Sequence, residues 1–215
     1  VEDLDIEQIL ENSLDLKREV IKTIPETIIK KVGIQPKEHI EKIDITQGKL
    51  NMGLRTNTSF TEEAYYPLVV CSAVLGGGPH SKLFMNVREK SSLAYYAFSQ
   101  LEKFKGLMLI GAGIDFENYE KTVDIIEKQL EDIKNGNISD KELDASKKSI
   151  ITSLKAMQDQ PGQIINYYLG NVIGKTDKTI DDYIEAIEAV EKDDVSQVAK
   201  RIKLDTIYFL RRHKK

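Results

Sequence analysis

Three side chains that can bind and polarise a carbonyl group lie close together in the 215-residue sequence. Arg88 precedes Tyr95 by seven residues and Tyr96 by eight. The pattern predicts a helix over about 82–90 and a strand over 93–101, so these groups can meet at one sheet edge. An arginine and a tyrosine hydroxyl together can hold a peptide carbonyl and stabilise an oxyanion. From residue types alone the simpler interpretation is favoured, in which Arg88 pairs with a surface carboxylate and the tyrosines pack.

A regular strand would turn Tyr95 and Tyr96 to opposite faces, so only one of them can face a cavity. The Gly-rich turn before the helix, Gly76 to Lys82, is not a phosphate loop. Ser81 stands where that motif needs glycine, and Leu83 replaces the hydroxyl that would bind magnesium. The sequence therefore predicts a tight backbone turn here, with Ser81 able to cap the next helix.

The sequence has few residues that could bind a metal ion or act as a thiol nucleophile. The chain has three histidines, His39, His80 and His213, and a catalytic zinc needs three protein ligands, usually two of them close in sequence. The run 35–39 ends like an H-x-x-E-H zinc motif but begins with Gln35, which predicts strand-edge residues and no metal site in this chain. The single cysteine, Cys71, lies in an apolar run and is predicted to be buried and inert.

The composition excludes several partner classes. With 31 basic and 35 acidic residues the formal net charge is −4, which argues against nucleic acid as the main partner. No apolar run approaches the roughly 18 residues that span a bilayer, so no membrane contact is expected. A reducing cytoplasm is the expected compartment. The first residue is Val1 rather than Met, so we expect a fragment or a processed chain.

The elements that must position these residues follow from periodicity. Residues 1–34 are predicted to form a helical lead-in or linker, and 35–215 one α+β domain. Within this domain we expect a hairpin over 39–46 and 49–56, a helix over 62–75, and a second hairpin over 93–101 and 107–114. A run of helices follows, in which the residues from Ser139 to Glu142 form a capping box that opens one helix and Pro161 begins the next. A last strand covers 204–210. This order predicts one antiparallel sheet with helices packed on one face.

The stretch from 76 to 97 resembles the second-half signature of the pitrilysin/insulinase family of inverted zinc peptidases, which includes the mitochondrial processing peptidases. The resemblance covers about residues 35–212. It rests on the Gly-rich turn and on Ser81-Lys82-Leu83-Phe84, Val87-Arg88-Glu89-Lys90 and Leu93-Ala94-Tyr95. It implies one α+β half of a two-half clamshell in which the other half carries zinc. The Ala94–Ala97 run and the ending Thr206–Leu210 resemble the non-catalytic Gram-positive bacterial branch most.

The resemblance also implies roles for individual residues. Arg88 and Tyr95 match the family pair that faces the substrate and the scissile carbonyl, and Gly77, Gly78, Ser81 and Tyr96 would contact substrate beside them. The expected partners are a homologous N-terminal half or partner subunit and a peptide. No cofactor is expected in this chain, and any zinc would lie on that other half.

Three functions remain open. The first is the substrate-binding half of a zinc endopeptidase. The second is a non-catalytic peptide-binding or assembly module, with a free strand edge at 93–101 that accepts an extended peptide. The third is a structural half that only covers its sister half.

Overall fold

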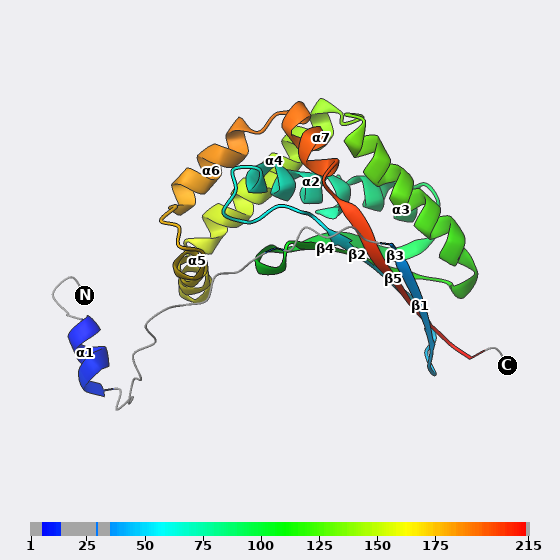
Figure 1. The fold of residues 1–215 in the computed structure, drawn as a ribbon, viewed down its shortest axis with the longest axis horizontal. Coiled ribbons are helices and arrows are strands. Elements are labelled where there is room, and N and C mark those ends of the chain that lie inside the picture. The colour runs from blue at the N-terminus through cyan, green and yellow to red at the C-terminus, as the bar shows by residue number, and fades with distance from the viewer. Residues whose placement is uncertain (1–5, 14–28, 30–34, 214–215) are drawn as a thin grey trace.

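The computed structural model describes residues 6–13, 29 and 35–213 (Figure 1). In chain order its elements are α1 (Ile6–Ser13), β1 (Lys37–Lys42), β2 (Gly48–Arg55), α2 (Tyr65–Gly76), the π-helix η1 (Phe84–Glu89), β3 (Ala94–Glu102), the 3₁₀ turn η2 (Lys103–Lys105), β4 (Leu107–Ile114), the 3₁₀ turn η3 (Phe116–Asn118), α3 (Tyr119–Lys134), α4 (Asp140–Met157), α5 (Pro161–Gly174), α6 (Ile180–Ala189), α7 (Lys192–Ala199) and β5 (Lys203–Arg211). Apart from α1 and Ile29, the predicted lead-in over 1–34 lies outside the described residues.

The strands form one sheet in the order β1-β5-β2-β4-β3. Helices α2, α3, α4, α6 and α7 lie on one face of it, as Figure 1 shows. The predicted α+β class, with helices packed on one face, is confirmed. One strand contact departs from a purely antiparallel sheet, because β1 pairs with β5 in parallel.

The predicted first hairpin is wrong. β1 and β2 both form, but β5 lies between them and pairs with each. The segment after β1 instead bonds to the end of β5, where the Ile43 amide donates to the Arg211 carbonyl over 2.9 Å. Alternation of apolar and polar residues indicates a strand but not its neighbour, so the sequence could not place the last strand of the chain inside this pair.

The core lies between the sheet and α2, and every second residue of β2 and β4 points into it. Its fully buried side chains include Leu50, Met52, Leu54, Met108, Ile110, Ile114, Leu68, Val74, Leu75 and Phe209. At the end of α2 the fit is close, because a Cβ at Gly76 would collide with the backbone at Ser99 of β3. α2 and β3 therefore pack closely against each other, and the turn that leads to Arg88 starts from the end of α2.

The helix signals in the sequence are confirmed. Ser139 caps α4 in a reciprocal capping box with Glu142, and Pro161 opens α5. Pro67 lies in the first turn of α2, where the missing amide costs nothing.

Candidate functional site

Arg88 lies in a helix of unusual pitch. The sequence predicts an ordinary helix over 82–90, but residues 84–89 form a π-helix, in which the Lys90 amide donates to the Met85 carbonyl over 3.0 Å. Buried Ser81 supports its start, since its Oγ accepts from the Phe84 amide over 3.4 Å. Short π segments are frequent at functional sites, because the wider turn re-aims the side chains it carries.

Two backbone hydrogen bonds connect the end of this helix to the start of β3. The Ser92 amide donates to the Arg88 carbonyl over 3.1 Å, and the Leu93 amide donates to the Val87 carbonyl over 3.0 Å. Ser92 itself has φ of 50°, a left-handed conformation that a residue with a side chain adopts at a cost. The junction between Arg88 and Tyr95 is therefore a short, closely bonded turn.

The Arg88 side chain remains accessible. Its guanidinium lies over the Phe84 ring, with Cζ 4.7 Å from the ring centroid, and its Nε is 3.7 Å from Glu89 Oε1. Such a loose, exposed ion pair contributes little stability, so the carboxylate does not lock the guanidinium in place. The contact with Phe84 orients the arginine without enclosing it.

Tyr95 is 61% exposed, and its hydroxyl donates to Asp115 Oδ1 over 3.3 Å. The prediction that Tyr95 and Tyr96 lie on opposite faces assumes a regular strand, and β3 is irregular at this point. Ala94 pairs with Ile114 and Tyr96 with Gly113, so Tyr95 is an extra residue in a β-bulge. The bulge breaks the alternation and leaves both tyrosines exposed.

Tyr96 lies on the helix-free face of the sheet, because its partner Gly113 alternates with the core residues of β4. Its ring stacks on Phe98, with centroids 6.1 Å apart, and occupies the space above Gly113. Arg88, Tyr95 and Tyr96 are thus presented at one junction between helix and strand. Within the described part of the chain no hydrogen bond joins Arg88 to either tyrosine.

The residues of the Gly-rich turn differ in how exposed they are. Gly77 is exposed, and Gly78 has φ of 152°, a conformation that favours glycine. Ser81, expected to touch substrate, is fully buried, and its Oγ accepts from the Phe84 amide at the helix start, the capping role that the sequence also predicts. His80 has a buried Nε2 without a hydrogen-bond partner, and burial lowers its pKa, so the ring stays neutral near pH 7.

A buried ion pair behind this turn is a feature that the sequence did not reveal. Lys82 is almost fully buried, and its Nζ lies 3.0 Å from Glu142 Oε1. Burial alone would raise the pKa of Glu142, but hydrogen bonds from Ser139 and then the Lys82 charge leave it lowered. The pair ties the helix of Arg88 to α4. Its two residues lie far apart in the chain, and no local pattern links residues at such a separation.

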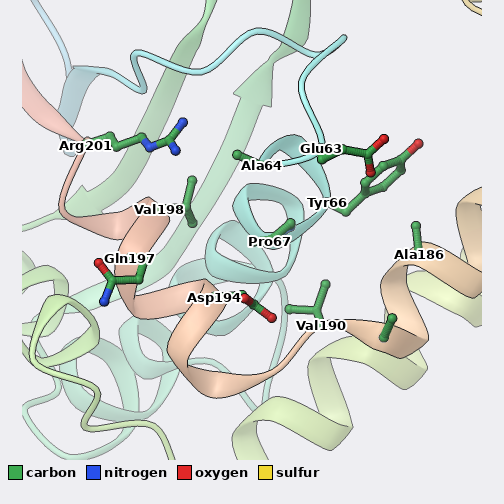
Figure 2. Close-up of a pocket in the computed structure, with 11 residues that line it drawn as sticks. Glu63, Ala64, Tyr66, Pro67, Ala186, Val190, Asp194, Gln197, Val198 and Arg201 are labelled. Atoms are coloured by element: carbon green, nitrogen blue, oxygen red, sulfur yellow. The ribbon is translucent and has the colours of Figure 1, made fainter.

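Three hollows lie on the helical side of the domain. One of about 390 Å³ lies between the start of α2 and the helices α6 and α7, with Pro67, Val190 and Val198 among its apolar residues (Figure 2). One of about 210 Å³ is lined by four tyrosines, Tyr65, Tyr66, Tyr167 and Tyr183. One of about 440 Å³ lies between α2, β3 and α4, and Gly77 lines it. Arg88 and Tyr95 line none of the three.

Among the described residues, no three His, Cys, Asp or Glu side chains converge in a way that could hold a metal ion. None of the described helices is both long and apolar enough to cross a membrane.

Comparison with known proteins now identifies the fold. Residues 5–150 match the family described as the peptidase M16 inactive domain. The chain belongs to this family. The resemblance to the second half of an inverted zinc peptidase is thereby confirmed.

Curated relatives of this M16 inactive domain are longer than the chain itself. The probable inactive metalloprotease YmfF of Bacillus subtilis is 40% identical over 178 residues, which cover 83% of this chain and 42% of YmfF. The uncharacterized zinc protease YmxG of the same organism is 29% identical, over 80% of this chain and 44% of YmxG. The chain thus spans less than half of each relative.

Solved structures of similar proteins have the same fold. A conserved protein from Enterococcus faecalis is 34% identical with a TM-score of 0.77, over 87% of this chain and 44% of that one. An M16 inactive domain from Pseudomonas fluorescens, 16% identical, has a TM-score of 0.70 over 84% of this chain and 44% of that chain, which shows the shared fold.

Proposed function

We propose that this chain is the substrate-binding, non-metal half of a zinc metallopeptidase-like protein. It supplies Arg88 and Tyr95 to a zinc site on another half or subunit. The observation that carries the proposal is that both side chains are exposed at one helix–strand junction, where a π-helix and a β-bulge present them. The guanidinium and the phenol would bind the carbonyl of a peptide and stabilise the charge that develops on its oxygen.

The test uses the complete assembly of this chain with its zinc-bearing half, and measures kcat/KM on a peptide. Arg88→Ala is expected to lower it by about 10²–10³-fold, the scale for losing one oxyanion donor. Arg212→Ala is the matched control, because Arg212 is also exposed and also lies over a phenylalanine, Phe116, at 5.5 Å. An unchanged rate for a folded, assembled Arg88→Ala protein would refute the proposal.

A second candidate is a non-catalytic peptide-binding or assembly subunit, and a specific observation favours it. β3 is the last strand of the sheet, and the hollow of about 440 Å³ lies along it, lined by Ser99, Gln100 and Leu101. An extended peptide could add to this edge and place side chains in the hollow. This hypothesis predicts peptide binding without cleavage, whatever zinc is supplied.

Ser153→Trp distinguishes the two. Ser153 lines the hollow from α4, whereas its exposed neighbour Thr152 does not, so Thr152→Trp is the control. A scaffold should lose peptide affinity with Ser153→Trp and keep it with Arg88→Ala.

We also infer a cytoplasmic location, which the lone, buried Cys71 supports.

A further inference from the structure

Helix α5 combines two properties that no other described helix combines. The chain is 31% charged, yet the 14 residues from Pro161 to Gly174 include no charged side chain. The central helix α2 is also uncharged, but most of its residues are buried in the core. On α5, by contrast, Ile165, Tyr168, Leu169 and Val172 are 46–66% exposed. Their spacing of three, one and three residues places them on a single face, so they form an apolar stripe on the surface.

The stripe is not the face that holds α5 to its own domain. That contact uses two glycines on another side of the helix. A Cβ at Gly170 would come within 2.6 Å of Lys103 Nζ, and one at Gly174 would collide with the Phe60 ring. Tyr167 adds hydrogen bonds to the carbonyls of Lys178 and Thr179, at 3.0 and 2.9 Å. These contacts already hold α5 against its own domain, and the apolar stripe takes no part in them.

Contiguous exposed apolar side chains of this kind mark interaction surfaces in soluble proteins. Permanent interfaces are more apolar than transient ones and poor in charge at their centre, as α5 is. A standard interface needs about 800 Å² from each partner, more than four side chains can supply. The occupant must therefore extend beyond α5 onto neighbouring surface, which fits a folded domain better than a single helix.

We propose that the stripe of Ile165, Tyr168, Leu169 and Val172 is a docking surface for the second α+β half of the M16 assembly. This inference rests on the proposed pairing with another half and names the surface that the pairing uses. Relative lengths support the occupant. YmfF, YmxG and the Enterococcus protein each extend over more than twice the length matched here, which is space for a second domain of this size.

The test is thiol labelling. Native Cys71 is fully buried and does not compete for the reagent. Ile165→Cys places a probe in the stripe, and Lys128→Cys places a control on an exposed position of α3. Maleimide labelling rates are measured for the whole 215-residue chain alone. They are then measured for the chain co-expressed with the part of YmfF that lies outside the matched segment. Size-exclusion chromatography with light scattering reports assembly.

In the chain alone, we expect the Ile165→Cys variant to label as fast as the Lys128→Cys variant. In the two-half assembly the stripe variant should label at least about tenfold more slowly, with the control variant unchanged. Leu169→Glu should weaken assembly without lowering the stability of the isolated chain. Unchanged labelling of the Ile165→Cys variant in an assembled complex would overturn the proposal, and so would failure of the halves to associate.

Protection of the stripe thiol in the isolated chain would also overturn the proposal. Protection that falls on dilution would assign the stripe to a second copy of this chain. Protection that persists on dilution and is lost when residues 1–34 are removed would assign it to the N-terminal segment. Arg88→Ala should leave all labelling rates unchanged, so failure here and failure of the catalytic proposal are separable.

Discussion

The ring of Tyr96 lies directly against Gly113 on the neighbouring strand, in the space that a side chain at position 113 would fill. Gly113→Ala would push the ring away from Phe98 or strain the β3–β4 pair. We expect it to lower the free energy of unfolding by about 1–3 kcal/mol, as overpacking does. Urea denaturation measures this loss.

Gly53→Ala is the control on the same face of the sheet. A Cβ at Gly53 would lie 3.8 Å from the Thr206 carbonyl oxygen, an ordinary contact. Replacing a strand glycine without a clash should be neutral or stabilise by about 0.5–1 kcal/mol. Equal effects of the two substitutions would show that the Tyr96 ring does not depend on Gly113.

The Cys71 thiol is predicted to be inert in the native protein. Burial raises its pKa to about 12, and the charge of Lys134 offsets only part of that rise. At pH 8 almost no thiolate is present, and the sulfur is not accessible. Ellman's reagent should therefore titrate one thiol only after unfolding in guanidinium. Rapid reaction in native buffer would contradict the burial.

The Lys82–Glu142 pair predicts a pH-dependent contribution to stability. Lys82→Met keeps the apolar stem but leaves Glu142 without its buried cation. At pH 7 we expect a loss of about 1–3 kcal/mol by chemical denaturation, because an uncompensated charge remains partly buried. Lys121→Met, on the exposed surface of α3, should change little.

The direction of this pH dependence follows from the pKa of Glu142, which is lowered from an ordinary value of 4.5 in the folded state. The pair stabilises the protein fully above that ordinary value and is lost as pH falls through the lower, folded-state pKa. The difference between wild type and Lys82→Met should therefore shrink below about pH 4.5. A difference that stays constant down to about pH 3 would exclude the ion pair as its cause.

Arg88→Ala and Tyr95→Phe should leave stability almost unchanged. Arg88 makes only a loose ion pair and a contact with Phe84, and the Tyr95 hydroxyl makes one exposed hydrogen bond to Asp115. Surface groups of this kind contribute under about 1 kcal/mol. Thermal unfolding should show shifts of a few degrees at most. A larger shift would mean that an activity loss in either variant reflects the fold.

Local sequence signals predicted most of the elements. The capping box at Ser139, the proline that opens α5 and the apolar alternation in β2 and β4 each act over a few residues, so they can be recognised without the fold. What could not be predicted depends on distant partners. The insertion of β5 between β1 and β2 and the Lys82–Glu142 pair both join residues far apart in the chain.

At the candidate site, too, some features could be predicted from local sequence and others could not. The sequence predicted a helix that carries Arg88 and a strand that carries Tyr95, and both elements form, yet neither the π-helix nor the β-bulge was predicted. Both are departures by a single residue from a regular element. Periodicity averages over such departures, although they decide which way each side chain points. Ser81 is an example, because it was expected to contact substrate and its side chain is buried.

The position of β5 has a consequence for how the protein is made. β1 is synthesised well before its partner β5, which follows about 170 residues later by the pairing of Lys37 with Thr206. Until then β2 has β4 on one side and an open edge on the other. The nascent domain must keep that gap free of foreign strands. Completion of the sheet therefore waits until residues 203–211 have been synthesised, and a stop codon only a few residues before 203 would leave β1 and β2 without their shared neighbour.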